Sequence, residues 1–239
     1  MEYIVGVPAR LNSKRIPEKL LKQINGKSAI MHTLDNIRKV VHISQIFVFA
    51  DSKKIYDEVT RYGYNCVIVD EECENGTERV AKGVEKLFCL FENVLIIHAD
   101  QPLIEEENIR TIIEFWKQSK RKSKTMYTLH TKCNIKNDKS IAKIAFNKEG
   151  KWLYISRSDI PYNSNLMYKH FGLCMFSKQL LREYLELQIG NLQKIEDNEW
   201  LKLLENGYDI ISKEISFHNT DLNTYENFNE ISRIINSNI

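Results

Sequence analysis

The sequence predicts an α/β fold built on a mixed, mostly parallel sheet flanked by helices. Over the first half of the chain, short and continuously apolar runs alternate with longer segments of helical period. Apolar runs bracketed by helices are typical of parallel strands that are covered on both faces. The chain of 239 residues is 43% hydrophobic and 28% charged, which is sufficient for one such domain with a substantial core.

The first two predicted strands are each followed by a predicted helix. The apolar run at 3–7 is the first strand, and the segment 29–41 has the period of a helix. The run at 47–50 is the second strand, and the helix after it covers about 52–62. Both pairs fit the alternation expected of a parallel sheet.

The next two strands repeat this arrangement. The third strand is predicted at 66–69, and a helix begins near Thr77, which we expect to cap it. The fourth strand is predicted at 94–97, before a helix whose apolar face is formed by Ile109, Ile112, Ile113 and Trp116. Because parallel sheets bind ligands at the carboxyl ends of their strands, we expect the chemistry in the loops that follow the four strands.

The second half of the chain has a different pattern. The segments 142–146 and 152–156 flank the turn residues 147–150 and predict a hairpin. A strand at 171–176, a helical pair over about 177–205 and an amphipathic helix over 224–235 follow. Since no linker or repeat interrupts the chain, we predict a single domain over 1–239, in which the segment of about 135–190 is an inserted dimerisation or sugar-binding element.

Composition argues against several classes of protein. The net charge is +2 and the basic residues are spread among acidic ones, so no nucleic-acid partner is expected. The five cysteines are odd in number and show no C-x-x-C spacing, which argues against a disulfide framework and a thiolate zinc site. No apolar run approaches the length of a membrane span. We expect a soluble, cytoplasmic protein without a membrane partner.

Four cations gather in the loop after the first strand. They are Arg10, Lys14, Arg15 and Lys19, beside Ser13 and Pro17. Cations at the carboxyl end of a parallel strand suit a triphosphate, and a solvated basic loop is the alternative. Neither G-x-x-x-x-G-K-[ST] nor G-x-G-x-x-G occurs in the sequence, which argues against a P-loop ATPase and a dinucleotide enzyme.

A carboxylate, Asp100, follows the fourth predicted strand. Beside a cationic loop it is suited to holding Mg²⁺ against phosphate oxygens, since magnesium needs only one or two protein carboxylates. The alternative is a turn or a helix cap, where aspartate is favoured in any protein. The residue type and its position leave both interpretations open.

Several short motifs occur in order along the chain. They are P-A-R-L-N-S-K-R-I-P-E-K at 8–19, I-N-G-K at 24–27, A-D at 50–51, N-G-T-E-R at 75–79, Y-I-S-R-S-D-I-P at 154–161 and K-H-F-G-L at 169–173. In this order and spacing, the chain resembles the bacterial CMP-3-deoxy-D-manno-octulosonate synthetases and, more loosely, the CMP-sialic acid synthetases. The resemblance covers nearly the whole chain.

The resemblance implies both a fold and a reaction. The fold would be that of the nucleotide-diphospho-sugar transferases. The reaction would be the Mg²⁺-dependent transfer of CMP from CTP to the anomeric hydroxyl of 3-deoxy-D-manno-octulosonate, or of a closely related acidic ulosonic sugar, with release of pyrophosphate. A homodimer and a place in lipopolysaccharide or capsule biosynthesis are implied as well.

The resemblance also assigns residues to roles. Arg10, Lys19 and Asp100 would be catalytic, and Asp100 and Asp221 would hold the metal. CTP contacts are implied for Pro8, Ala9, Arg10, Ser13, Arg15, Lys19, Asp51, Gly76, Thr77 and Arg79. Sugar contacts are implied for His98, Arg157, His170, Lys194 and Glu196. The match around Asp221, over 218–224, is looser, and capping of the last helix by Asp221 or Asn223 is the alternative.

Three departures from the family pattern lie on the sugar side. His98 stands in the place of a glutamine and Cys174 in the place of a tyrosine, and the segment 191–196 keeps Glu196 but lacks a glutamate–histidine pair. A satisfied structural histidine is the alternative for His98. Arg157 and Lys194 could meet the carboxylate of the acid or could be surface charges.

These departures leave other functions open. One is transfer of CMP to a different acidic sugar, such as a nonulosonic (sialic-like) acid or an amino-octulosonate, and another is a catalytically silent CTP-binding module. A sugar-1-phosphate nucleotidyltransferase or a glycosyltransferase on the same scaffold is disfavoured, because the sequence contains neither G-x-G-T-R nor Asp-x-Asp.

Overall fold

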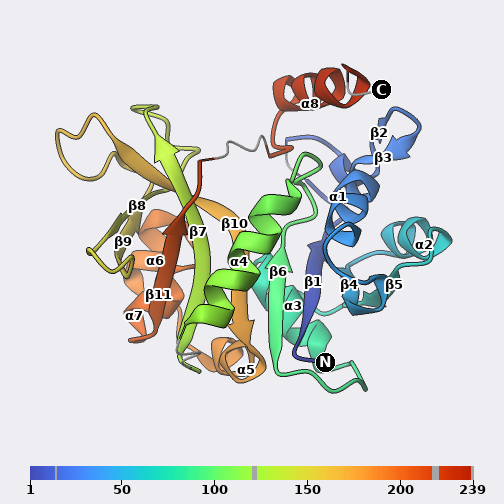
Figure 1. Ribbon diagram of the computed structural model, residues 1–239, viewed down its shortest axis with the longest axis horizontal. Helices are drawn as coiled ribbons and strands as arrows, with labels where there is room; N and C mark the ends of the chain where they lie inside the picture. The colour runs from blue at the N-terminus through green and yellow to red at the C-terminus, as the bar shows by residue number, and fades with distance from the viewer. Residues whose placement is uncertain (14, 120–122, 217–220, 238–239) are drawn as a thin grey trace. The chain divides into compact units, whose positions relative to one another are not determined.

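The computed structural model describes residues 1–13, 15–119, 123–216 and 221–237 (Figure 1). The chain divides into two compact units. The first unit comprises Met1–Arg110 and His218–Ile239, and the second comprises Thr111–Phe217. The segment of about 135–190, predicted to be an inserted element, lies wholly within the second unit.

The first unit contains a parallel sheet. Its strands are β6 (Asn93–Ile97), β1 (Tyr3–Ala9), β4 (Ile46–Ala50) and β5 (Asn65–Ile68), in that order. All three pairings are parallel, and Ala9 at the end of β1 lies opposite Ala50 at the end of β4. The strands predicted at 3–7, 47–50, 66–69 and 94–97 are thus confirmed, and their carboxyl ends share one edge of the sheet.

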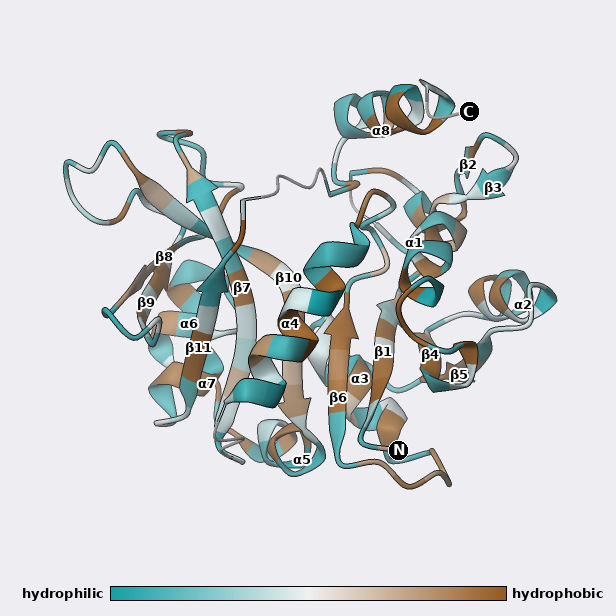
Figure 2. Cartoon of the chain, viewed as in Figure 1, coloured by the Kyte–Doolittle hydropathy of each residue, from teal (hydrophilic) through white to brown (hydrophobic). Residues whose placement is uncertain are grey.

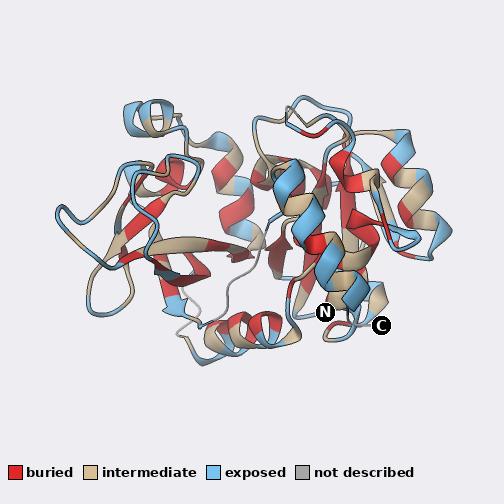
Figure 3. Cartoon of the chain, turned by 90° about the horizontal axis from the view of Figure 1, so that it is seen from above, coloured by how far each residue is buried: buried red, intermediate tan, exposed pale blue. Residues whose placement is uncertain are grey.

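Apolar sequence explains this sheet. β1 and β6 are coloured as hydrophobic over most of their length (Figure 2), and Ile4, Val5, Val7 and Val94 to Ile97 are fully buried. Figure 3 shows the buried residues concentrated on strands and on one side of the helices. Burial of continuous apolar strands between helices is the main stabilising contribution expected for this architecture.

Helices follow the strands as predicted. The first unit contains α1 (Ala29–Arg38), α2 (Lys53–Arg61) and α3 (Gly76–Val84), and α4 (Glu106–Gln118) begins in it. Short elements complete it, namely η1 (Lys19–Leu21), β2 (Gln23–Ile24), β3 (Lys27–Ser28) and η2 (Ile43–Gln45). Gly83 lets α3 pack against β4, because a Cβ at that position would lie 2.1 Å from the Phe49 ring.

The cap of α3 differs from the prediction. The helix begins at Gly76, and the side chain of Asn75 accepts a hydrogen bond of 2.8 Å from the amide of Glu78. Thr77 was predicted to cap this helix, and that prediction is wrong because Thr77 already lies in its first turn. Asn75 is as effective a cap as threonine, so residue type alone did not distinguish the two positions.

The second unit contains a mixed sheet. β7 (Thr125–Cys133) lies between β11 (Asp209–Glu214), which is parallel to it, and β10 (Met167–Ser177), which is antiparallel. The predicted hairpin is confirmed as β8 (Lys143–Phe146) and β9 (Trp152–Ser156), and β8 also pairs with β10. The predicted strand at 171–176 is the second half of β10.

Two strands of this sheet were not predicted. β7 interrupts its apolar residues with Thr125, Thr128, His130 and Thr131, all of which are buried. β11 ends in polar residues, Ser212 to Glu214. Neither segment offers the continuous apolar run or clean alternation by which a strand is recognised in sequence.

Helices complete both units. The predicted helical pair over 177–205 is three helices, α5 (Lys178–Glu186), α6 (Asn191–Glu196) and α7 (Leu201–Glu205), because Asp197 adopts a left-handed conformation that ends α6. The last predicted helix is confirmed as α8 (Tyr225–Ser237), which belongs to the first unit. Across the described ranges, no helix is both long and apolar enough to cross a bilayer.

Candidate functional site

The loop after β1 is fixed by Asp51. Its Oδ1 accepts a hydrogen bond of 2.8 Å from the amide of Leu11, and its own amide donates to the carbonyl of Ala9 over 3.2 Å. Arg79 lies beside it, with 3.8 Å between Nη2 and Asp51 Oδ2, and donates from Nη1 to the carbonyl of Val69 over 2.8 Å. Asp51 and Arg79, both predicted to contact CTP, therefore join the loops after β1, β4 and β5.

The first turn of α3 approaches the same loop. A Cβ on Gly76 would lie 3.1 Å from Pro8 Cγ, so the absence of a side chain permits this approach. The Oγ1 of Thr77 is buried without a hydrogen-bond partner among the described residues. Amides of a first helical turn favour anions, so this hydroxyl and the start of α3 are suited to phosphate oxygens, and the predicted contacts of Gly76 and Thr77 with CTP stay predictions.

Among the cationic side chains of this loop, the two arginines are exposed, whereas Lys19 is buried. Arg10 and Arg15 are exposed, and Ser13 is half-buried between them in sequence. Ile16 is fully buried and anchors the loop to the core of the unit. Lys14 lies outside the described residues. The two guanidinium groups are thus available to a ligand, and their contacts to phosphates stay a prediction.

Lys19 behaves differently from the arginines, because it is buried and paired. Its Nζ lies 2.6 Å from Asp100 Oδ2 and donates to the carbonyl of Leu222 over 3.0 Å. A third oxygen, Oδ1 of Asn223, lies 3.5 Å away. Burial opposes ionisation of Asp100, but the charges of Lys19 and His98 outweigh it and lower the pKa of this carboxyl. Asp100 is therefore an anion at neutral pH.

The second candidate metal ligand is held near the first. Asp221 Oδ1 accepts a hydrogen bond of 3.2 Å from the side-chain amide of Gln101, and the amide of Leu222 donates to the carbonyl of Asp100 over 2.9 Å. Two segments more than a hundred residues apart in sequence are therefore joined backbone to backbone at the end of β6.

The alternative role of Asp221 as a helix cap is not what the structure shows. Thr224 and Asn227 cap α8 reciprocally, with Asn227 N donating to Thr224 Oγ1 over 3.2 Å and Thr224 N donating to Asn227 Oδ1 over 3.1 Å. Neither Asp221 nor Asn223 is needed for this cap. Asp221 is exposed, and the part of its segment at 218–220 lies outside the described residues.

The oxygen atoms around Lys19 and Asp100 form a donor set that fits magnesium. Asp100, Asp221, the Leu222 carbonyl and the Asn223 amide supply hard oxygen atoms, and the ammonium of Lys19 already occupies part of the set as a stand-in cation. Within the described ranges, no group of three or more His, Cys, Asp or Glu side chains could hold a metal. Few protein ligands suit magnesium, which keeps water and phosphate oxygens in its coordination sphere.

His98 lies two residues before Asp100, just beyond β6. Its Nε2 is buried, and no described residue provides it with a hydrogen-bond partner. The alternative interpretation of a satisfied structural histidine therefore finds no support within the described ranges. A buried ring nitrogen without a partner is suited to a ligand hydroxyl or carboxylate.

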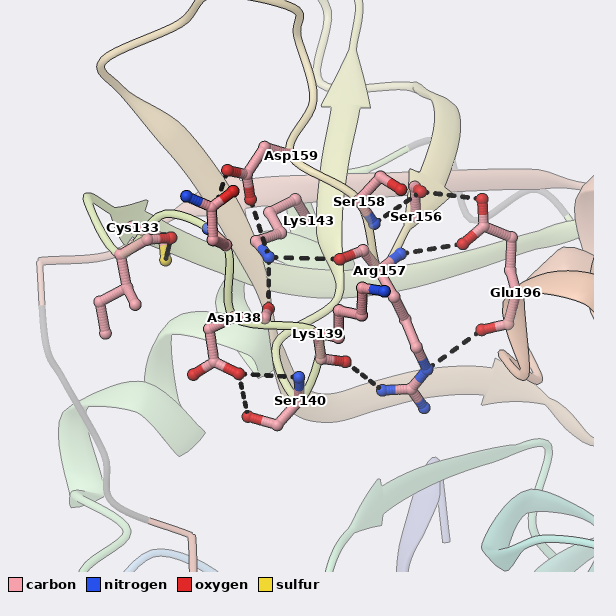
Figure 4. Close-up of polar contacts among 12 residues, drawn as sticks. Cys133, Asp138, Lys139, Ser140, Lys143, Ser156, Arg157, Ser158, Asp159 and Glu196 are labelled. Carbon is pink, nitrogen blue, oxygen red and sulfur yellow. Dashed lines mark hydrogen bonds and ion pairs between the residues drawn. The ribbon is translucent and has the colours of Figure 1, made fainter.

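In the second unit, Glu196 is the centre of a hydrogen-bond network (Figure 4). Its Oε1 accepts from Ser156 Oγ over 2.8 Å and from Tyr154 OH over 3.2 Å, and its Oε2 accepts from the amide of Arg157 over 2.9 Å. These contacts join the end of α6 to the end of β9. Glu196 thus has a structural role in this unit, and its predicted sugar contact stays a prediction.

Arg157 completes the same network. Its guanidinium donates to the carbonyls of Glu196 over 3.1 Å and Lys139 over 3.2 Å (Figure 4). It also donates to the carbonyl of Asp197 over 2.9 Å. A cation against the last carbonyls of a short helix is favourable, and it holds the 139 loop to α6. Lys194, on the same helix, is exposed. The structure thus brings Arg157 and Glu196 together.

His170 lies on β10 in an aromatic setting. Its ring makes edge contacts with Trp152 and Trp200, with centroid separations of 5.5 and 5.3 Å. Its Nε2 lies 3.0 Å from Thr128 Oγ1 and 3.5 Å from Cys174 Sγ. Burial raises the pKa of the Cys174 thiol, so this residue is a neutral thiol in the place where the family pattern has a tyrosine.

Comparison with known proteins gives the family. A family model described as "Cytidylyltransferase" matches residues 4–215. The chain belongs to this cytidylyltransferase family. It is 32% identical to the 3-deoxy-manno-octulosonate cytidylyltransferase of Fusobacterium nucleatum, over 100% of this chain and 98% of that protein. It is 31% identical to the enzyme of the same name from Chlamydia felis, over 97% and 93%. The resemblance drawn from the sequence motifs is thus confirmed.

Solved structures confirm the predicted fold class. A CMP:2-keto-3-deoxy-manno-octonic acid synthetase complexed with CTP superimposes with a TM-score of 0.90 at 22% identity, with full coverage of both chains. A cytidylyltransferase from Leptospira borgpetersenii superimposes with a TM-score of 0.67 at 11% identity, over 99% of this chain and 87% of that one. This cytidylyltransferase therefore has the nucleotide-diphospho-sugar transferase fold.

Two polar residues of this cytidylyltransferase, Gln101 and Lys143, were not singled out from the sequence, and Asn223 was named only as a possible cap of the last helix. Gln101 donates a hydrogen bond to Asp221, and Asn223 lies near Lys19. Lys143 is fully buried, with Nζ 3.1 Å from Asp159 Oδ1 and hydrogen bonds to the carbonyls of Asp138 and Arg157 (Figure 4). The sequence contained a signal only for Lys143, a lysine at the start of an otherwise apolar strand segment.

Proposed function

We propose that this cytidylyltransferase transfers CMP from CTP to the anomeric hydroxyl of 3-deoxy-D-manno-octulosonate and releases pyrophosphate. One observation supports this proposal above the others, namely the contact of 2.6 Å between Lys19 and Asp100 at the base of the cationic loop. It brings a phosphate-binding cation and a metal-binding carboxylate together at the carboxyl ends of β1 and β6. Relatives of about this length that share about a third of their residues carry the name of this activity.

The reaction is a displacement at the α-phosphorus of CTP. The anomeric hydroxyl gives up its proton to water, and its oxygen forms a new bond to that phosphorus. The bond between the α-phosphorus and the bridging oxygen breaks, and its electron pair leaves with the pyrophosphate. Arg10, Ser13, Arg15 and Lys19 bind phosphate oxygens together with the start of α3. They neutralise the charge that develops on the leaving pyrophosphate, so catalysis consists mainly of positioning and electrostatic stabilisation.

Magnesium is the metal that we assign to Asp100 and Asp221. When bound there, it would neutralise phosphate charge and orient the triphosphate. The protein contributes two carboxylates on separate segments. The hydrogen bond from the amide of Leu222 to the carbonyl of Asp100 holds these two segments together. Gln101 orients Asp221 through its side-chain amide.

The acceptor contacts in this proposal are those that the family resemblance implies. His98 offers the unpartnered Nε2, and His170, Arg157, Lys194 and Glu196 are the other residues assigned to the sugar. The positions of His98 and Cys174 differ from the family pattern, so an acidic sugar with a different substituent is the alternative acceptor. The product, a CMP-activated acidic sugar, would serve lipopolysaccharide or capsule synthesis in the cytoplasm.

The direct test is pyrophosphate release from CTP with magnesium and a panel of acidic sugars. We expect release with 3-deoxy-D-manno-octulosonate and none when UTP replaces CTP. Release only with another ulosonic or nonulosonic acid would keep the reaction and reassign the acceptor. Binding of CTP without release from any sugar of the panel would contradict the proposal and favour a silent CTP-binding module.

We also propose that the protein is a homodimer formed through its second unit. Large apolar side chains are exposed on that unit, namely Ile135, Leu153, Tyr162, Leu166, Leu192 and Ile195. Exposed apolar side chains that lie together mark protein interfaces, and the first four of these belong to the segment of about 135–190 that was predicted for dimerisation. Light scattering after size exclusion should give twice the mass of the 28.1 kDa chain, and Leu153→Asp should give the monomer. A monomeric unmodified protein would contradict the proposal.

A further inference from the structure

The ammonium group of Lys19 is enclosed by oxygen atoms. Its Nζ lies 2.6 Å from Asp100 Oδ2, 3.0 Å from the Leu222 carbonyl and 3.5 Å from Asn223 Oδ1. We call these three oxygens the oxygen cage. A carboxylate, a backbone carbonyl and a side-chain amide oxygen are the donor types that hold hard cations in proteins. The cage is therefore a cation site that the chain fills with its own side chain.

The charges at the cage exclude a second cation while Lys19 is present. Lys19 balances the single negative charge of Asp100, and both side chains are largely buried, with 11% and 20% of their surfaces exposed. Asp221 is exposed, and Gln101 donates a hydrogen bond to it. A divalent ion on Asp100 would lie within a few ångströms of an ammonium in a partly desolvated site, where like charges repel strongly.

Lys19 can leave the cage without moving the backbone around it. Leu20 is buried beside it in η1, and Ile16 and Leu222 belong to one apolar cluster with Ile24 and Ile231. This cluster holds the first loop to the last segment of the chain independently of the ion pair. The four-carbon stem of lysine has the freedom to carry Nζ from a carboxylate to a nearby phosphate oxygen.

We propose that the Lys19 ammonium and the divalent cation are alternative occupants of the oxygen cage, so that the protein excludes the cation until triphosphate oxygens draw Lys19 away. The free protein then binds the metal weakly, and nucleotide and metal bind together. Asn223 is a positioning residue in this arrangement, because its side-chain oxygen faces whichever cation the cage holds.

Binding of Mn²⁺ to the protein without nucleotide tests this inference. Measured by calorimetry or by the loss of the free-ion electron paramagnetic resonance signal, Lys19→Met should bind Mn²⁺ at least about tenfold more tightly than the unmodified protein, since it removes a neighbouring positive charge. Lys27→Met is the matched control, because it removes an exposed ion pair of the same length, 2.6 Å to Asp35, in the same unit. It should leave Mn²⁺ binding unchanged.

Further variants make each outcome decisive. Asp100→Asn in the Lys19→Met background should abolish the gain, because the cage then lacks its carboxylate. Lys19→Gln removes the charge but keeps a hydrogen-bond donor, and serves if circular dichroism shows that Lys19→Met does not fold. Equal Mn²⁺ affinity of the unmodified protein and the folded Lys19 variant would overturn the inference.

The inference rests on the proposed magnesium site, but its test is separate from that of the proposed function. Turnover of CTP by the unmodified protein tests the function and does not enter the Mn²⁺ measurement. Tight Mn²⁺ binding by the unmodified protein, together with normal turnover, would refute alternative occupancy and leave the proposed function in place.

Discussion

Single residues just after β6 carry the chemistry that we propose for this cytidylyltransferase. Asp100 remains ionised because nearby positive charge outweighs the cost of its burial, and Lys19 supplies the larger part of that charge. His98 and Thr77 each present a buried polar atom that the described part of the chain leaves without a partner. Buried polar atoms are normally satisfied, so both atoms are suited to a ligand.

The residue-scale prediction concerns Asp100. In Asp100→Asn, the side chain keeps its shape but loses the charge that holds a metal against the triphosphate. Turnover should fall at least about a hundredfold, the usual effect of removing one charge-stabilising group, while CTP still binds through the loop. Pyrophosphate release and equilibrium binding of labelled CTP measure the two effects.

The matched control is Asp57→Asn, which removes an exposed carboxylate paired with Lys53 on α2. It should leave both turnover and CTP binding unchanged. Undiminished turnover in Asp100→Asn would exclude Asp100 from the metal site and from catalysis.

At the scale of elements, the helix ends and the loops position these residues. Asn75 caps α3 and directs its first turn toward Pro8, while Asp51 fixes the start of the β1 loop. In the second unit, hydrogen bonds of Arg157 and Glu196 join β9, the 139 loop and the end of α6. The geometry at these positions depends on hydrogen bonds between loops that are distant in sequence.

The element-scale prediction concerns the cap of α8. Thr224→Ala removes the oxygen that accepts from the amide of Asn227, which should lower the free energy of unfolding by about 1 kcal/mol. Urea denaturation followed by circular dichroism measures it. Thr60→Ala, inside α2, is the control, because the higher helix propensity of alanine offsets its lost hydrogen bond to Tyr56. Equal stability of the Thr224 variant and the unmodified protein would show that α8 does not depend on this cap.

At the scale of the whole molecule, buried polar groups make stability depend on pH. His130 on β7 is buried between Phe146 and Tyr168, and its Nδ1 lies 2.8 Å from Ser212 Oγ on β11. Burial lowers the pKa of His130 to about 4. The unfolded chain therefore binds a proton at this residue near pH 6.5, whereas the folded chain binds it only near pH 4.

The free energy of unfolding should consequently fall as the pH decreases from about 6.5 toward 4. Between pH 7.5 and 5, His130 should account for about 2 kcal/mol of the decrease in the free energy of unfolding. His130→Gln, measured by urea denaturation at both pH values, should show a correspondingly smaller decrease. His42→Gln, at an exposed position, is the control and should keep the pH dependence of the unmodified protein. An unchanged pH dependence in His130→Gln would contradict the assignment.

Much of this protein followed from sequence alone, because the information was local. Continuous apolar runs predicted the four parallel strands of the first unit, and collinear motifs predicted the family; the residues that they assign to a nucleotide site stay a prediction. The cations of 10–19 and Asp100 were recognisable because each follows an apolar strand, and parallel strands bring their carboxyl ends to one edge.

The tertiary structure decided what depends on contacts between distant segments. β7 and β11 escaped prediction because buried threonine, serine and histidine side chains are satisfied by partners that only the folded sheet supplies. The place of Asn223 beside Lys19 and the network between Arg157 and Glu196 are likewise set by hydrogen bonds across 39 to 204 residues of sequence. Periodicity and composition report which side chains avoid water, but they do not report which polar atoms meet inside the protein.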